Sequence, residues 1–445
     1  MEAFQTATNR APIVERSVPV AIPPELETPG GSLFLSNLDQ LFVALVPVVY
    51  FFDRSAASTV DVIKRALSKV LVPYFPVAGR LAKNSQGKFT VDCAKKLGVP
   101  FVEAWANFDV KHLGDMQLID PDVSRKLIYT DPIETKLEDA PLLTAQVTKF
   151  RCGGFTIGIL CNHRIFDGVS AMNFMNSWAE IARGKPVSII PSHERTLLKS
   201  RVPPQITAAY EVFVPVSDVS NLTGLYKEEQ NVQRSFHFNG EKLAILKKMA
   251  TADGRVTSSI SSFIALAALP WRARSMASKM KQHQPSKLFF AVDRRAMLKV
   301  PKHFGNATAG ACLSRLRGEL INQPISSTAE RIKKATERVD EEYVRSWIDS
   351  FEMYGMDAFS LSLLVLTSWQ RLDYGSTDFG WGNPRQFGCG PLLENTCVVL
   401  PKGSGRKGLV LMLSLPFSAM NTFEKLLQFS TCEPETPSLR SRARM

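Results

Sequence analysis

Apolar residues recur along the chain with both helical and strand spacing. One helical stripe lies between a possible cap at Ser58 or Thr59 and a stop at Pro73, and it consists of Ile63, Ala66, Leu67, Val70 and Leu71. A second stripe follows a plausible cap at Thr328 and consists of Ile332, Ala335, Val339 and Tyr343. Both patterns are typical of helices that bury one face and expose the other.

Strand patterns lie between these stripes. Apolar residues occupy every second position of 155–161, and the runs 396–400 and 409–415 predict two strands joined by a hairpin loop at 402–408. The apolar run 41–52 contains Pro47 and is shorter than the ~20 residues of a membrane span, so it predicts a buried strand. The mixture of helices and strands predicts an α/β fold class.

The length of 445 residues is compatible with two or three domains of ~100–200 residues each. The composition, with 45% apolar and 22% charged residues, is ordinary for a soluble globular protein. The stretch 185–233 is rich in proline, has weak periodicity and is the best candidate for a linker. We therefore predict an N-terminal domain at 1–184, a crossover linker at 185–233 and a C-terminal domain at 234–445.

The charge and the cysteines narrow the classes of partner. A formal charge of +12 suits a polyanionic ligand such as coenzyme A, RNA or an anionic membrane without choosing among them. The chain has no arginine-rich run, zinc-finger spacing or aromatic RNA-binding signature, so we expect no nucleic-acid partner. Seven cysteines without a CxxC pair argue against a disulfide framework or a zinc site. Because 1–12 shows no signal peptide, we expect a cytosolic protein without a membrane span.

The candidate chemistry begins at His163, directly after the predicted strand 155–161. Asp167 and Gly168 follow, and a helix ending near Gly184 is predicted by Phe174, Trp178 and Ile181. At such a turn a side chain can point into a cleft, and an imidazole that titrates near pH ~6.5 suits general-base work. A structural, hydrogen-bonded histidine is the alternative. We expect no metal, because no HExxH or facial-triad pattern supplies a third ligand.

Two glycine-rich segments have different meanings. Residues 403–408 match GxGxxG, but a strand follows where a dinucleotide site requires a helix, so we reject that site. No GxSxG elbow or phosphate loop occurs, which removes the simplest hydrolase and ATPase interpretations. The segment 378–382, Asp-Phe-Gly-Trp-Gly, predicts a tight loop whose two aromatic side chains must pack against the protein. For Asp378 itself, a purely structural turn stays open.

Four segments, in order, resemble the plant BAHD acyl-CoA-dependent acyltransferases. Residues 74–81 are similar to the family's Tyr-Pro-Leu-Ala-Gly-Arg-Leu stretch, and 262–272 are similar to its central helix. Residues 163–168 match its HxxxDG motif, and 378–382 match its DFGWG motif without change. HxxxD alone also occurs in chloramphenicol acetyltransferases, carnitine acyltransferases and peptide-synthesis condensation domains. The pairing of the two motifs is therefore what makes the resemblance specific.

Three further segments, 31–39, 176–184 and 197–204, resemble one branch of that family. This branch transfers hydroxycinnamoyl groups such as feruloyl to ω-hydroxy fatty acids and fatty alcohols, and shikimate and spermidine hydroxycinnamoyltransferases are near relatives. Transfer to shikimate, quinate or a polyamine is the alternative function. A non-catalytic accessory protein of wax or cuticle lipid synthesis is an alternative of another class. A condensation-type enzyme is less favoured, because Asn162 replaces the first of its two typical histidines.

The resemblance implies a two-domain, chloramphenicol-acetyltransferase-like fold. Each domain is a mixed β-sheet with flanking helices, and an active-site channel lies at the interface between the domains. The reaction proceeds in a ternary complex, without a covalent intermediate and without a metal. No permanently bound cofactor is implied. Acyl-CoA is the co-substrate, a small alcohol or amine is the acceptor, and we expect a monomer.

The resemblance also assigns roles to residues around the two motifs. His163 is the general base, and Asp378 is the other residue required for catalysis, although its loop lies off the site. Asp167 turns away from the substrate, pairs with Arg295 and shapes the turn together with Gly168. The remaining residues of the supporting loop are Gly380, Trp381 and Gly382.

The substrate contacts are assigned by resemblance as well. Thr367 and Trp369 match a segment that lines the acceptor pocket, and Ser261 and Ser262 begin a helix near the pantetheine path. Two departures from the family pattern bear on these contacts. Residues 302–306 read Lys-His-Phe-Gly-Asn in place of Gly-Tyr-Phe-Gly-Asn. Pro270 falls inside the predicted helix 259–274, where a proline costs ~3 kcal/mol or kinks the helix.

Overall fold

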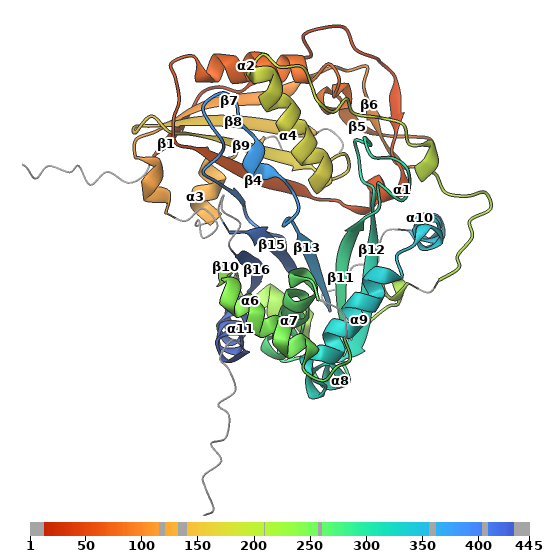
Figure 1. Cartoon of the computed structure of the whole chain (residues 1–445). Coiled ribbons are helices and arrows are strands. Elements are labelled where there is room, and N and C mark those ends of the chain that lie inside the picture. The colour runs from red at the N-terminus through yellow and green to blue at the C-terminus, as the bar shows by residue number, and fades with distance from the viewer. Residues whose placement is uncertain are drawn as a thin grey trace, which may run out of the picture.

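A computed structural model describes residues 13–114, 121–131, 140–208, 210–256, 260–355, 362–402 and 408–430. Two large sheets, one mostly from each half of the chain, lie one above the other, with a small third sheet beside the first (Figure 1). Both large sheets are mixed, since each combines parallel and antiparallel strand pairs. This arrangement confirms the α/β fold class.

The sheets consist of the following strands. The first has the order β1-β7-β8-β9-β4-β14, with β2 also paired to β7, and contains β1 (Val14–Arg16), β2 (Val20–Ile22), β4 (Leu45–Phe52), β7 (Val99–Ala106), β8 (Leu143–Phe150), β9 (Phe155–Asn162) and β14 (Gln386–Cys389). The second has the order β10-β16-β15-β13-β11-β12 and contains β10 (Asn231–Phe238), β11 (Pro285–Asp293), β12 (Thr308–Leu316), β13 (Leu363–Ser368), β15 (Thr396–Pro401) and β16 (Leu409–Pro416). The small sheet contains β3 (Ser32–Phe34), β5 (Arg80–Lys83) and β6 (Phe89–Asp92).

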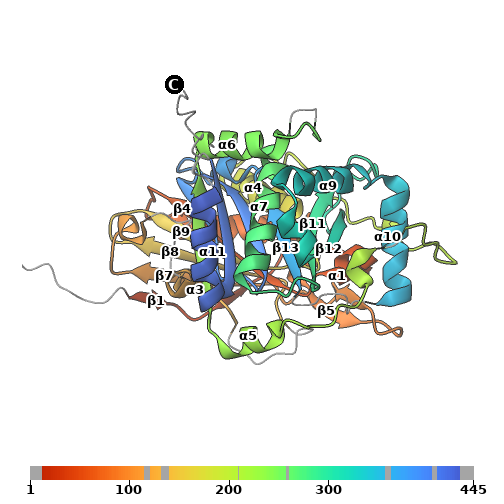
Figure 2. The same cartoon turned by 90° about the horizontal axis from the view of Figure 1, so that it is seen from below.

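Helices flank both large sheets. The first half contributes α1 (Asn37–Leu41), α2 (Thr59–Val70), α3 (Pro121–Lys126) and α4 (Gly168–Ala182). The rest of the chain contributes α5 (Leu222–Glu228), α6 (Gly240–Thr251), α7 (Ser262–Ala277), α8 (Arg317–Asn322), α9 (Ile325–Glu337), α10 (Glu341–Tyr354) and α11 (Phe417–Ser430). Short 3-10 helices are η1 (Phe75–Ala78), η2 (Val110–Leu113), η3 (Thr196–Leu198), η4 (Glu211–Phe213) and η5 (Tyr374–Ser376). Seen from below, α6, α7, α9 and α11 cover the second sheet (Figure 2).

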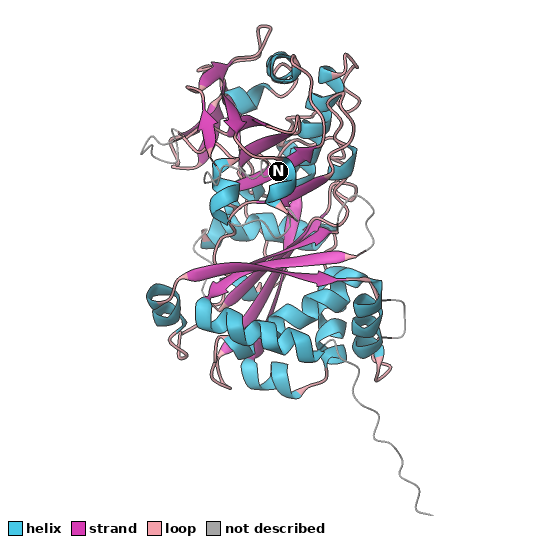
Figure 3. Ribbon diagram, turned by 90° about the vertical axis from the view of Figure 1, so that its left-hand side faces the viewer, coloured by secondary structure: helices cyan, strands magenta, loops and turns pink. Residues whose placement is uncertain are grey.

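The two faces of the second sheet have different partners. Cys397 and Val399 of β15 belong to the core that the C-terminal helices close, whereas Val398 and Leu400 belong to the core of the first half. This division follows from the strand geometry, because successive side chains point to opposite faces. The first half therefore packs on one face of the second sheet and the helices pack on the other (Figure 3).

The chain returns to the first half after β13. Residues 386–389 form β14, which pairs with β4 in antiparallel register, and Tyr374, Phe379 and Phe387 are buried in the core of the first half. The ranges 1–184, 185–233 and 234–445 stay a prediction. The strand pairing adds that the last range also supplies one strand to the first sheet.

Most of the predicted elements are confirmed. The stripe behind Ser58 is α2, the alternating segment is β9, and the helix after His163 is α4, which ends before Gly184 with a positive φ of 71°. The runs 396–400 and 409–415 are β15 and β16, an antiparallel pair, although 403–407 of their predicted loop lie outside the described residues. The central helix, predicted over 259–274, is α7, which begins only at Ser262, ends at Ala277 and continues through the buried Pro270.

Two predicted elements were wrong in their bounds. The stripe behind Thr328 belongs to two helices, because the side chain of Asp340 accepts a hydrogen bond from the Tyr343 amide at 2.8 Å and begins α10. Thr328 is not a cap but is buried inside α9. The apolar run 41–52 is also divided, since Leu41 ends α1 and the strand begins only at Leu45.

Gly158 in the middle of β9 offers a test of this packing. A Cβ at this position would lie 2.0 Å from the main-chain oxygen of Leu127, so the main chain at 127 would have to shift. We expect Gly158→Ala to lower the free energy of unfolding by ~1–3 kcal/mol or more, measured by urea denaturation. Gly240→Ala is the control, because a Cβ there would meet nothing within 4 Å. Equal stability of the two variants would contradict the described position of 127 against β9.

Candidate active site

His163 lies at the turn between β9 and α4, as the sequence predicts. Its amide donates to the carbonyl oxygen of Ala44 at 2.9 Å, which extends the pairing of β9 with β4 by one residue. Asp167 is the N-cap of α4, and its side chain accepts a hydrogen bond from the Ser170 amide at 2.9 Å. The turn is therefore fixed at one end by a main-chain hydrogen bond and at the other by the side chain of Asp167.

The imidazole of His163 is half-buried and lies against the ring of Phe42, with 4.5 Å between the ring centroids. Its Nδ1 is buried without a hydrogen-bond partner in the part of the chain that the structure describes, whereas Nε2 is not enclosed in this way. Burial lowers the pKa of the ring below its ordinary value, and this outweighs the opposing effects of its own main chain, of the Asp167 and Asp39 charges and of the Asn306 side chain. The ring is therefore neutral near pH 7, with Nε2 as the accessible nitrogen.

Asp167 and Arg295 form a buried ion pair beside this turn. Arg295 donates to Asp167 Oδ1 at 2.7 Å, and the two side chains are 5% and 4% exposed. Arg295 also donates to the carbonyl oxygen of Gly305 at 2.7 Å. Its pKa is raised, because the charges of Asp167 and Asp293 outweigh the desolvation that would lower it. Asp167 is thus engaged by Arg295 and the helix N-terminus, and no hydrogen bond joins it to Nδ1 of His163.

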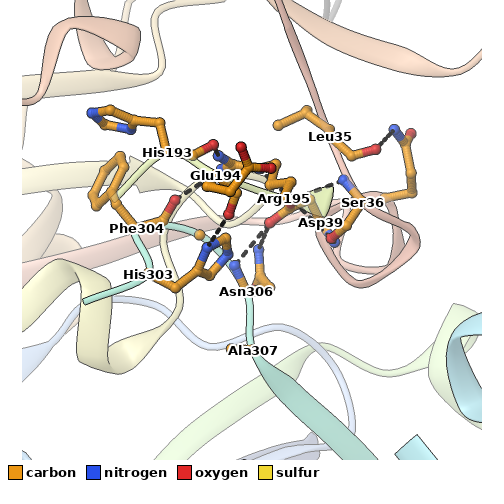
Figure 4. Close-up of polar contacts among 12 residues, drawn as sticks. Leu35, Ser36, Asp39, His193, Glu194, Arg195, His303, Phe304, Asn306 and Ala307 are labelled. Atoms are coloured by element: carbon orange, nitrogen blue, oxygen red, sulfur yellow. Dashed lines mark hydrogen bonds and ion pairs between the residues drawn. The ribbon is translucent and has the colours of Figure 1, made fainter. Parts of the chain in front are cut away.

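A second buried ion pair lies near the same turn and was missed in the sequence. Arg195 Nε donates to Asp39 Oδ2 at 3.0 Å, and the side chains are 2% and 0% exposed (Figure 4). Burial alone would raise the pKa of Asp39, but the charge of Arg195 and hydrogen bonds from Asn306 hold it below the usual range. The only sequence signal was that Asp39 and Asn306 both lie in segments that resemble the family.

The loop 378–382 forms a tight turn around the Asp378 carboxylate. Asp378 Oδ1 accepts hydrogen bonds from the amides of Gly380 at 2.7 Å and Gly382 at 2.9 Å. Both glycines have positive φ values, 109° and 97°, which other residues adopt only with strain. Arg183, the C-cap of α4, also lies 3.4 Å from Asp378 Oδ2. The carboxylate therefore organises the loop that it begins.

The aromatic side chains of this loop pack on the first half. Phe379 lies between Phe52 and Trp178, at centroid distances of 5.9 and 5.4 Å, and Trp381 lies 5.8 Å from Phe155. Because the loop contacts the end of α4 opposite to Asp167, the 15-residue helix separates it from the turn of His163. At 1.5 Å per residue that separation is ~22 Å. Asp378 and His163 are thus not brought together.

The other predicted contacts lie at two separate places. Thr367 lies within β13, and Trp369 directly follows its last residue. The side chain of Trp369 is buried in the core of the first half. Thr367 pairs with Val398, so its side chain faces the first half. Ser261 is the exposed N-cap of α7, where its Oγ accepts a hydrogen bond from the Ile264 amide at 3.2 Å, and Ser262 is the next residue.

No metal centre was found in the residues that the structure describes, since no group of three or more His, Cys, Asp or Glu side chains comes together there. Six cysteines of the described ranges are unpaired. Within the same ranges, none of the helices has the length and apolar character needed to cross a membrane.

Comparison with known proteins identifies the family. A family profile described as "Transferase family" matches residues 14–429. The chain is 42% identical to omega-hydroxypalmitate O-feruloyl transferase of Arabidopsis thaliana over 425 residues, which cover 93% of this chain and 92% of the relative. It is 39% identical to fatty alcohol:caffeoyl-CoA acyltransferase of the same plant over 424 residues, or 93% and 98% of the two chains. The chain belongs to the BAHD acyltransferase family.

Solved structures agree with the fold of this BAHD acyltransferase. Vinorine synthase superposes with a TM-score of 0.73 at 21% identity, covering 94% of this chain and 98% of the other. TRI101 of F. graminearum, complexed with coenzyme A and deoxynivalenol, gives a TM-score of 0.72 at 17% identity and coverage of 89% and 97%. The two-domain, chloramphenicol-acetyltransferase-like fold is confirmed. Acyl-CoA is the co-substrate of the family.

The ion pair beside His163 predicts a large effect on stability. Asp167→Asn keeps an acceptor for the helix cap but leaves the buried Arg295 without its closest counter-charge, so we expect a loss of ~3 kcal/mol in the free energy of unfolding. Asp53→Asn is the control, because Asp53 and Arg385 form a pair in which both side chains are 59% exposed. For that variant we expect a loss below ~1 kcal/mol. If urea titrations showed similar losses in the free energy of unfolding for Asp167→Asn and Asp53→Asn, burial would not explain the effect of the Asp167–Arg295 pair on stability.

The lowered pKa of His163 predicts the pH dependence of acyl transfer. The sequence predicts that His163 is the general base. A base must be unprotonated, and a lowered pKa keeps the imidazole unprotonated at more acidic pH. The acidic limb of kcat/KM should therefore have its midpoint below the ordinary histidine value of ~6.5. Any residual transfer by His163→Ala should lack this limb. If the acidic limb of the wild-type kcat/KM profile had its midpoint at pH ~6.5 or above, burial would not be the main influence on the pKa of His163.

Proposed function

We propose that this enzyme transfers a hydroxycinnamoyl group, such as feruloyl, coumaroyl or caffeoyl, from its CoA thioester to the hydroxyl of an ω-hydroxy fatty acid or a fatty alcohol. The observation that carries the proposal is the 42% identity to omega-hydroxypalmitate O-feruloyl transferase over nearly the whole of both chains. The 39% identity to fatty alcohol:caffeoyl-CoA acyltransferase supports it. Shikimate O-hydroxycinnamoyltransferase of Nicotiana tabacum is less similar, at 32% over 427 residues.

His163 is the general base of the proposed reaction. Its Nε2 is accessible, its pKa is lowered by burial, and its neighbour Asp167 is already held by Arg295. An alcohol is a poor nucleophile until its proton has an acceptor, and a positioned base contributes ~10²–10⁴-fold to the rate. Holding the two substrates together in the interface between the halves contributes further.

The bonds and protons balance in two steps without a covalent enzyme intermediate. The acceptor hydroxyl gives its proton to Nε2 of His163 while its oxygen attacks the thioester carbonyl carbon, and the carbonyl electron pair moves to the oxygen. The tetrahedral oxyanion then re-forms the carbonyl and expels the CoA thiolate. The imidazolium returns the proton to this thiolate, so that an ester and free CoA leave with His163 neutral again.

The remaining site residues are proposed in supporting roles. The side chain of Thr367 in β13 faces the first half. The ring of Phe42, which lies against His163, also lies 6.3 Å from the ring of Phe289 in β11, the strand next to β13. Thr367 and Trp369 therefore suit contacts near the reacting carbonyl in a channel between the domains. Residues 261 and 262 suit the CoA path, where the amides at the start of α7 favour an anionic or polar group. Asp378 acts on the architecture of its loop and not on the reacting atoms.

A donor-by-acceptor screen tests the proposed reaction. Feruloyl-, caffeoyl- and coumaroyl-CoA are each incubated with ω-hydroxypalmitate, a long-chain alcohol, shikimate and spermidine, and the products are identified by mass spectrometry. We expect esters of the two fatty acceptors, with His163→Ala lowering kcat by ~10²–10⁴-fold. His112→Ala is the matched control, because His112 is exposed on η2, and its rate should be unchanged.

Three results would contradict the proposal in different ways. Undiminished transfer by His163→Ala would end the role of the base. Transfer to shikimate or spermidine without transfer to the fatty acceptors would replace the acceptor class. If wild-type protein transferred nothing, and His163→Ala restored wax or cuticle lipids in a loss-of-function plant, the accessory function would hold instead.

A further inference from the structure

His163 is oriented in an unusual way for a base. In the described part of the chain no carboxylate contacts its Nδ1, so the group that commonly aims a histidine is missing. What holds the residue is its main chain, together with the ring of Phe42. The His163 amide donates to Ala44 of the first half, and its carbonyl accepts a hydrogen bond from Asn306 Nδ2 of the second half at 2.8 Å.

The orientation of the Asn306 amide is defined by its surroundings. Asn306 is fully buried, and its Nδ2 also donates to Asp39 Oδ1 at 3.1 Å, while its main-chain amide donates to the same oxygen at 2.8 Å. A carbonyl and a carboxylate are acceptors only, so the side-chain nitrogen must face both of them. The two hydrogens of one amide group therefore join the His163 main chain to Asp39.

Asp39 is itself fixed by donors from three directions. Besides Asn306, its carboxylate accepts hydrogen bonds from the amide and hydroxyl of Ser36, at 3.0 and 2.9 Å, and from Arg195 Nε at 3.0 Å. Arg195 in turn donates to the carbonyl oxygens of His193 at 2.9 Å and Phe304 at 2.8 Å. Figure 4 shows Asp39 between Arg195 and Asn306, which come from different segments of the chain.

We propose that Asn306 is a positioning residue for the acyl transfer, and that through it the buried Asp39–Arg195 ion pair fixes the main chain, and thus the imidazole, of His163. The inference rests on the role of His163 proposed above. Both hydrogen-bond acceptors of Asn306 are held in place, since one belongs to the turn directly after β9, whose amide is paired with Ala44, and the other is a carboxylate saturated by donors. A shift of ~1 Å in a reacting group can cost ~10²-fold in rate.

Asn306→Ala is the direct test, with kcat and KM measured separately. We expect kcat to fall ~10–100-fold, less than in His163→Ala, with KM changed by less than ~3-fold, because Asn306 aims the base and contacts no substrate. Asn306→Asp keeps the volume but places an acceptor against the His163 carbonyl and Asp39, so it should be at least as impaired. Folding of each variant is verified by its thermal transition at the assay temperature.

Asp349→Asn is the matched control. Asp349 is also a buried carboxylate that holds the crossover segment, through Arg201 Nε at 2.6 Å and the Gln205 amide at 2.9 Å, but it does not contact the turn of His163. This variant should lose stability while its kcat stays within ~2-fold of wild type. Equal losses of kcat in Asn306→Ala and Asp349→Asn would overturn the inference, as would an Asn306→Ala kcat within ~2-fold of wild type.

A second readout needs no substrate, so it separates this inference from the proposed function. Diethyl pyrocarbonate modifies neutral imidazoles, and its rate at His163 is followed by peptide mass spectrometry, with the exposed His112 as internal reference. We expect the rate at His163 to change at least ~3-fold in Asn306→Ala and not in Asp349→Asn. If the wild-type protein transfers no acyl group, the proposed function fails. If the labelling rate of His163 is the same in Asn306→Ala as in wild type, the positioning role of Asn306 is rejected, whatever the result of the transfer assay.

Discussion

Two buried ion pairs lie beside the turn of His163, one between the two halves of the molecule and one between the first half and the crossover segment, and the geometry of the site depends on them. Asp167 pairs with Arg295 and Asp39 pairs with Arg195, with all four side chains at most 5% exposed. In such surroundings the loss of one partner is more damaging than the pair is stabilising, because the remaining charge stays buried. Both pairs also hold the segment 304–307 through its main-chain groups. Changes at either pair should therefore be transmitted to the same turn.

Local patterns explain why much of the site was predictable from the sequence. A strand followed by His163, then Asp167 and Gly168 and an amphipathic helix, is encoded within thirty residues, and β9 and α4 form as that pattern indicates. The two glycines after Asp378 likewise predict their own tight loop. The family resemblance then supplied the pairing of Asp167 with Arg295, which no local pattern contains.

The contacts that were missed are those between distant segments. Asp39 and Arg195 are 156 residues apart, and neither has a sequence neighbourhood that distinguishes a buried partner from a solvated charge. β14 is four residues long and pairs across the chain with β4, too short to have a periodicity of its own. The break between α9 and α10 was overlooked because the apolar spacing continues through Asp340, whose side chain competes with the helix for the Tyr343 amide.

The late strand β14 has a consequence for synthesis of the protein. Residues 45–52 leave the ribosome long before residues 386–389, so the growing chain must keep one side of β4 unpaired in the meantime. At ~5–20 residues per second the delay lasts tens of seconds. During that interval the nascent first half presents an open, apolar sheet edge, a template for association with other chains.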